Sequence, residues 1–135
     1  MLDTNVTIAG FTRADFDKKK IRKTLRIEGR AIQKIARKLI GRKAISRPGE
    51  FPGKQTGMMI RSIKVKVSRS GFLVRIAPEK IPGMKDFYPA FLHYGSTKNN
   101  LAPRKNNMTE ALDARRDISR NAILRSLQDS IIPRR

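Results

Sequence analysis

A helical period of apolar residues in the N-terminal third constrains the fold of this chain more than any other feature. Between residues 16 and 39 these residues recur at intervals of three and four, which places them on one face of an α-helix. The pattern predicts a long helix over residues 12–43, with Thr12 as its cap and Asp15 as the acid of a capping box. Gly29 is expected to weaken this helix slightly. The apolar series consists of Phe16, Ile21, Leu25, Ile32, Ile35, Ala36 and Leu39.

An apolar helix face needs a second layer to pack against, and alternating residues further along the chain predict a small antiparallel sheet. Apolar and polar residues alternate before and after Ser70-Gly71, which predicts a hairpin over residues 63–76. Val6 and Ile8 predict a short strand in an N-terminal arm at residues 1–11. Segments 44–62 and 77–106 are broken by Pro and Gly and are predicted as loops, and the stretches 44–57 and 77–87 are long enough to serve in docking. Within them, the aromatic stretch 87–94 is compatible with a strand or a helical turn.

A second helix is predicted over residues 107–130, with Asn107 as its cap and Glu110 three residues further on. Apolar residues from Met108 to Leu127 follow helical spacing, and residues 131–135 are predicted to be a loose tail. With 135 residues, the chain is the size of one domain. We therefore predict a single α+β domain, in which a long N-terminal helix and a C-terminal helix pack on a small antiparallel sheet.

The charge of the chain is its strongest compositional signal. Thirty-one Lys and Arg against 11 Asp and Glu give a net charge of +20, which attracts polyanions. Five of the basic residues step by four along the first predicted helix: Arg22, Arg26, Arg30, Lys34 and Lys38. This ridge is either a solvated face or a surface for DNA or an acidic partner. Because Trp is absent and aromatic residues are few, any nucleic-acid contact is expected to reach phosphates and not bases.

The residue types that carry most enzyme chemistry are scarce. Cysteine is absent and His93 is the single histidine, so neither a disulfide nor a thiolate or paired-histidine metal site is possible. The sequence holds no phosphate-binding loop or dinucleotide fingerprint. Asp113 and Asp117 share a helix face with nearby arginines, which neutralise them. We expect no catalytic residue, no cofactor, no metal and no small-molecule substrate, and His93 is expected to be structural or to contact a partner.

No signal-peptide pattern opens the sequence, and no apolar run approaches the roughly 20 residues that span a bilayer. We therefore expect a protein made in a cytoplasm without a membrane partner. Three segments then carry a resemblance to a known family: PGEFPGKQTGMMIRSIKVKV at residues 48–67, FYPAFLHYGS at residues 87–96 and LAPRKNNMTEALD at residues 101–113. In this order they resemble the tail-completion, or head–tail joining (neck), proteins of tailed bacteriophages, over residues 5–130.

This resemblance implies a structural virion protein that forms a homo-oligomeric ring, commonly a hexamer, at the head-proximal end of the tail. Such a ring lies between the tail tube and the head connector, and DNA passes through it. Gly57 and Gly95 are expected at positions where the backbone needs a positive φ or a close approach. The three aromatic residues Tyr88, Phe91 and Tyr94 either anchor a subunit contact or fill the core. The motif residues are Thr56, Gly57, Arg61, Ser62, Tyr88, Phe91, Tyr94, Gly95 and Pro103. The alternative is a free basic protein that binds nucleic-acid backbones.

Overall fold

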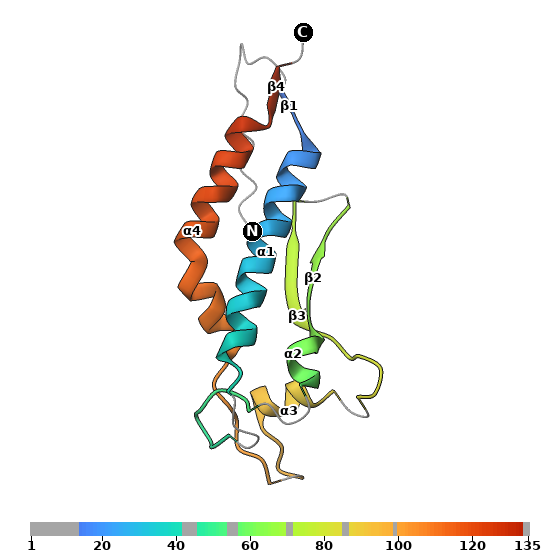
Figure 1. Ribbon diagram of the computed structural model, residues 1–135, viewed down its shortest axis with the longest axis vertical. Coiled ribbons are helices and arrows are strands. Elements are labelled where there is room, and N and C mark those ends of the chain that lie inside the picture. The colour runs from blue at the N-terminus through green and yellow to red at the C-terminus, as the bar shows by residue number, and fades with distance from the viewer. Residues whose placement is uncertain are drawn as a thin grey trace, which may run out of the picture.

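Two long helices and a β-hairpin lie side by side along the molecule (Figure 1). Helix α1 (Lys18–Leu39) lies between helix α4 (Asn107–Asp129) and the hairpin of strands β2 (Ile63–Val67) and β3 (Val74–Pro78). The computed structural model describes residues 14–41, 46–53, 57–69, 72–84, 87–98 and 100–133. The strand predicted near residues 5–9 and the predicted cap Thr12 lie outside these ranges. Within them, no helix is long and apolar enough to cross a membrane.

Short elements close the two ends of this arrangement. Helices α2 (Met58–Ser62) and α3 (Tyr88–Tyr94) lie at one end, and strands β1 (Ala14–Phe16) and β4 (Ile131–Pro133) pair at the other (Figure 1). The predicted α+β class with two long helices is confirmed, although the strands form two separate two-stranded antiparallel sheets. The prediction of a loop throughout residues 44–62 was wrong, since it contains α2. The aromatic stretch is helical, which decides between the two structures that its sequence allowed.

Helix α1 is shorter than predicted. It begins at Lys18 because the Asp17 carboxylate accepts hydrogen bonds from the backbone N–H groups of Lys19 (3.1 Å) and Lys20 (3.4 Å). Residues 14–16, predicted as helix, instead form β1. The helix ends at Leu39, and the N–H of Gly41 donates to the Pro52 carbonyl at 2.8 Å. A contact with a neighbouring loop therefore replaces the last predicted turn, whose residues 42 and 43 lie outside the described ranges.

The apolar stripe of α1 is the core side of the helix, as its spacing predicted. Ile21, Leu25 and Ile32 are buried, and Leu39 packs against the core. The central cluster joins α1 to the short helix α2, the start of the hairpin and the first turn of α4. Its buried members are Ile32, Ala36, Ile40, Met59, Ile63 and Ala111.

Helix α1 and the hairpin approach each other closely at Gly29. A Cβ added there would lie 2.8 Å from methyl groups of both Val65 and Val74. The glycine, expected to be a weak point of the helix, is thus required by the packing. The hairpin register pairs Val65 with Ile76 and Val67 with Val74. Strand β3 continues to Pro78, beyond the predicted limit at residue 76, and Phe72 lies before the strand. The predicted turn at residues 70–71 is outside the described ranges.

The α1–α4 contact is built from small and polar side chains. Buried Glu28 accepts hydrogen bonds from Arg115 Nε at 3.0 Å and from Ser119 Oγ at 2.7 Å. The Thr24 hydroxyl donates to that of Ser126 at 2.9 Å. Half of the six large apolar residues of α4 are exposed. Leu112, Ile118 and Leu124 are exposed.

The cap of α4 is Asn106 and not the predicted Asn107. The Asn106 side chain accepts hydrogen bonds from the N–H groups of Met108 (3.0 Å) and Thr109 (3.2 Å). Asn107 is buried, and its side-chain amide donates to the Ala36 carbonyl at 3.0 Å. The neighbouring asparagines therefore have different roles. Asn106 caps α4, and Asn107 attaches α4 to α1.

The prediction of a loose tail was wrong for residues 131–133. Phe16 pairs with Ile131 across the β1–β4 ribbon, and the N–H of Asp17 donates to the Ser130 carbonyl at 2.7 Å. The ribbon joins the first turn of α1 to the last turn of α4, which run antiparallel. Backbone hydrogen bonds across 117 positions of sequence leave no local pattern for a sequence reader to detect.

Candidate interaction surfaces

The outer face of α1 carries a continuous row of basic side chains. Six exposed residues at intervals of three and four share this face, which we call the α1 basic stripe: Lys19, Lys23, Arg26, Arg30, Lys34 and Lys38. None of them makes an ion pair with the described part of the chain. The single acid of α1, Glu28, points the other way into the α4 contact. The stripe is therefore uniformly positive and covers about 28 Å of helix.

The stripe differs from the predicted ridge at one end. Arg26, Arg30, Lys34 and Lys38 are exposed as the stepping pattern suggested, whereas Arg22 is half-buried. A strict step of four rotates by about 40° each time, so the ridge drifts around the helix. Lys19 and Lys23 occupy the place on the straight row that was assigned to Arg22. A pattern with one interval of three, between Lys23 and Arg26, in place of four would have identified Lys19 and Lys23 from the sequence.

The outward face of the hairpin is a second, smaller basic surface. Lys64, Lys66 and Arg75 are exposed there, and Lys66 lies directly opposite Arg75 in the register. Opposed like charges repel, and Lys66 Nζ lies 2.8 Å from a Glu79 carboxylate oxygen. One of the three cations is thus already paired within the chain.

Apolar side chains gather where the residues just before β3 meet the β1–β4 ribbon. The rings of Phe16 and Phe72 meet edge to face with centroids 6.4 Å apart, and Phe16 pairs with Ile131 across the ribbon. Leu73 follows Phe72 and is 63% exposed. We call these four residues the apolar tip. An exposed apolar cluster of this kind on a small chain marks an interaction site.

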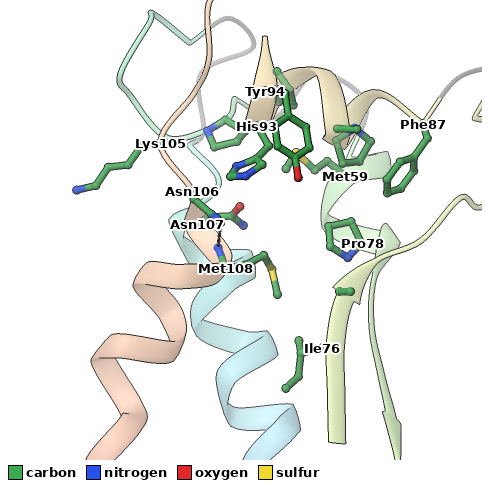
Figure 2. Close-up of a pocket in the computed structure, with 15 residues that line it drawn as sticks. Met59, Ile76, Pro78, Phe87, His93, Tyr94, Lys105, Asn106, Asn107 and Met108 are labelled. Atoms are coloured by element: carbon green, nitrogen blue, oxygen red, sulfur yellow. Dashed lines mark hydrogen bonds between the residues drawn. The ribbon is translucent and has the colours of Figure 1, made fainter. Parts of the chain in front are cut away.

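The opposite end of the molecule is hollowed instead. A pocket of about 360 Å³ opens between α3, the end of β3 and the start of α4. Figure 2 shows Tyr94, Phe87 and Met59 around this hollow, while the Lys105 side chain points away from it. Its lining is mostly apolar and includes Met59, Ile76, Phe87, Pro89, Leu92 and Met108, with His93 and Asn107 as polar members. We call it the apolar pocket.

The first motif of the resemblance forms the turn into α2. Gly57 has a φ of 76°, as predicted, which an L-residue with a side chain rarely adopts. Ser62 is fully buried and its hydroxyl donates to the Met59 carbonyl at 2.7 Å, whereas Arg61 is exposed. Thr56 lies outside the described residues. Ser62 therefore has a structural role, whereas any contact of Arg61 with a partner stays a prediction.

The second and third motifs meet at the pocket end. Gly95 has a φ of 77°, and a Cβ there would lie 2.9 Å from the Leu101 carbonyl and 3.0 Å from Pro103 Cδ. This close approach brings FYPAFLHYGS against LAPR. Phe91 and Tyr94 are exposed, Tyr94 by 78%, so neither fills the core. The side chain of Tyr88 is outside the described part of the structure. The core-filling interpretation is therefore wrong for Phe91 and Tyr94, and their contact with a partner stays a prediction.

Arg104 holds two loops of this end together and was not singled out from sequence. Its guanidinium donates to the Ser46 hydroxyl and carbonyl, both at 2.7 Å, and its own N–H donates to the Leu92 carbonyl at 2.6 Å. Next to it, the N–H of Lys105 donates to the Glu50 carbonyl at 2.9 Å. Arg104, through its side chain and backbone, and Lys105, through its backbone, thus shape the pocket end. A lone Arg in a loop gives no sequence signal for such contacts.

The described residues offer little for catalysis. Within those ranges, no three His, Cys, Asp or Glu side chains converge as a metal site requires. His93 is exposed and meets the Tyr94 ring edge to face at 4.5 Å between centroids. Asp113 accepts from Arg116 at 2.7 Å, which agrees with the expected neutralisation. The non-enzymatic role inferred from sequence stays a prediction.

Comparisons with protein families, with curated sequences and with solved structures give no match to this chain. Its functional interpretation accordingly depends on the surfaces described above and on the three ordered motifs.

Proposed function

We propose that this protein is a structural subunit of a tailed-phage particle, one copy in a ring that completes the tail and joins it to the head connector. Six copies is the expected number. The partners are further copies of the chain, the tail tube and the connector or neck proteins, and the place of action is the virion, after synthesis in the bacterial cytoplasm.

The observation that carries the proposal is the pair of unlike apolar surfaces at opposite ends of one chain. The tip exposes Phe72 and Leu73, whereas the pocket is hollow. When two different patches of one chain meet, the contact is heterologous, and repeated heterologous contacts close into rings when the rotation allows. A head-to-tail contact between tip and pocket would also cover the exposed Phe16, Phe87 and Tyr94.

The sequence motifs support the same proposal independently. They converge on the pocket end, where Gly95 and Arg104 hold the loops in place. Residues that shape one end of a chain without forming a catalytic cluster suit a docking role. The resemblance to tail-completion proteins and the position of the pocket therefore favour one conclusion, that this end meets a neighbouring subunit.

Solution mass and electron micrographs of the purified full-length protein test the ring. They are recorded over a range of salt concentrations, since salt screens repulsion between chains of charge +20. A discrete ring is expected. A monomer at every salt concentration, with salt-sensitive binding to any duplex, would favour the alternative of a free nucleic-acid-binding protein.

A complementation experiment tests the contact itself. Leu73→Glu disables the tip and Phe87→Asp disables the pocket, and both positions are exposed, so the fold should persist. Each variant alone is expected to remain monomeric. An equimolar mixture retains one intact tip and one intact pocket and is expected to form heterodimers that grow no further. Leu124→Glu, which removes an exposed leucine of α4 outside both surfaces, is the control and should assemble normally.

A further inference from the structure

We infer that the α1 basic stripe is a binding surface for the phosphate backbone of double-stranded nucleic acid, formed by each single chain whether or not it has assembled. The inference concerns a surface that is distinct from the tip and the pocket, so it does not depend on the ring.

The sign and density of charge on the stripe point to a polyanion. Helix α1 contains ten basic residues and one acid, and that acid is buried against Arg115 and Ser119. The six cations of the stripe are exposed and lack acidic partners in the described part of the chain. Like charges at these intervals repel along a helix. An extended anion would remove this repulsion and release its own counterions.

The shape of the stripe favours nucleic acid over an acidic protein. Interfaces between proteins have a partly apolar centre that is depleted of Lys. Only Ile27 interrupts the cations of this face, while the large apolar clusters of the molecule lie at its two ends. A straight row of about 28 Å spans about eight phosphates of one strand of a duplex, spaced 3.4 Å along the axis.

The residue types of the stripe also indicate which part of a nucleic acid it contacts. Single-stranded binding surfaces interleave cations with aromatic side chains on which bases stack. The stripe contains no aromatic residue, and Phe16, which precedes the helix, packs against Phe72 instead. Contacts to phosphates without base readout are therefore expected, and binding should be independent of sequence.

The test uses the full-length chain and a fluorescent random-sequence DNA duplex, with affinity measured at several salt concentrations. The stripe variant Arg26→Gln/Arg30→Gln removes two charges while keeping helix-forming residues. The control Lys64→Gln/Arg75→Gln removes two exposed charges from the hairpin. The stripe variant is expected to weaken binding by about tenfold or more and to lower the salt-dependence slope by about 1.8, which is 0.9 for each lost phosphate contact. The control should change affinity by less than about threefold, because its two charges lie outside the stripe, although both variants have the same net charge.

Equal losses in the two variants would overturn the inference, because binding would then follow net charge alone. Circular dichroism checks that each variant is folded, and Lys34→Gln/Lys38→Gln repeats the measurement at the other end of the stripe. A second arm adds polyglutamate as a competitor at equal charge concentration. If polyglutamate displaced the duplex as well as unlabelled duplex does, an acidic protein would be the better partner and the assignment to nucleic acid would fail. Solution mass in the same samples reports the ring separately.

Discussion

Helices α1 and α4 have nearly the same length, 22 and 23 residues, and lie side by side, yet they present opposite surfaces. Helix α1 buries its large apolar residues and exposes cations. Helix α4 contains four basic and four acidic residues and buries Asn107, Ala111 and Ser119 while large apolar side chains remain outside. One helix thus follows the usual amphipathic pattern and the other does not.

The difference shows that neighbouring helices on one small chain can present unlike surfaces. A uniformly positive face suits an extended anion, whereas mixed charges with exposed apolar residues suit protein contacts. Because Leu112, Ile118 and Leu124 are six positions apart, they lie on different sides of α4 and do not form one stripe. Helix α4 therefore offers scattered apolar contacts beside the concentrated ones of the tip and the pocket.

The largest expected effect compares one isoleucine from each helix. Ile32 on α1 is 6% exposed and Ile118 on α4 is 57% exposed. Ile32→Ala should lower the free energy of unfolding by about 3 kcal/mol, because it leaves a cavity in the core. Ile118→Ala should change it by less than about 0.5 kcal/mol. Urea unfolding measures both, and comparable losses would show that α4 is buried in the isolated chain.

A second comparison concerns one acid from each helix. Glu28→Ala leaves Arg115 without its partner next to a buried contact, so the free energy of unfolding should fall by about 2 kcal/mol. This loss is smaller than that for a fully buried pair, because Arg115 is 26% exposed. Asp113→Ala removes only the exposed pair with Arg116 and should cost less than about 0.5 kcal/mol. Thermal and urea unfolding provide the values. The double variant Glu28→Met/Arg115→Met should recover most of the loss, and failure to recover would show that Ser119 carries the contact.

A third change tests the side of α1 that packs closely against the hairpin. In an open helix, Gly→Ala stabilises by about 0.5–1 kcal/mol. Gly29→Ala should instead destabilise by about 1 kcal/mol, because the new methyl group overlaps Val65 and Val74 at 2.8 Å. Adding Val65→Ala should relieve part of the overlap and restore stability. A simple gain in stability from Gly29→Ala would mean that the hairpin can move away from α1 without cost.

The smallest effect comes from the exposed charges. Arg30 has cations four positions away on both sides, Arg26 and Lys34. Arg30→Gln should therefore raise the free energy of unfolding by a few tenths of a kcal/mol, about 0.3 kcal/mol, at low salt. The gain should vanish at high salt, where these charges are screened. Arg120→Gln on α4, where charges are mixed, should leave the stability almost unchanged at both salt concentrations. Melting temperatures at two salt concentrations decide this, and a salt-independent gain would exclude repulsion as its cause.

Much of the candidate surface on α1 could be predicted from the sequence. The three-and-four spacing identified Ile21, Leu25 and Ile32 as the buried side, and the exposure of Arg26, Arg30, Lys34 and Lys38 follows from it. Positive φ at Gly57 and Gly95 was also predictable, since only the local backbone is involved. The apolar tip and pocket were not, because each gathers residues from segments that the sequence does not place together.

The sequence by itself determined the α+β class, the two long helices, the core side of α1 and the excess of positive charge, since each depends on local periodicity or on composition. Tertiary structure alone decided that residues 14–16 do not extend α1, because they pair with β4. It also decided that Glu28 turns inward, that Gly29 is a contact point and that α4 buries small polar residues. In each case the deciding partner lies far away in sequence, and hydrogen bonds or steric contacts between distant segments leave no periodic trace in either one.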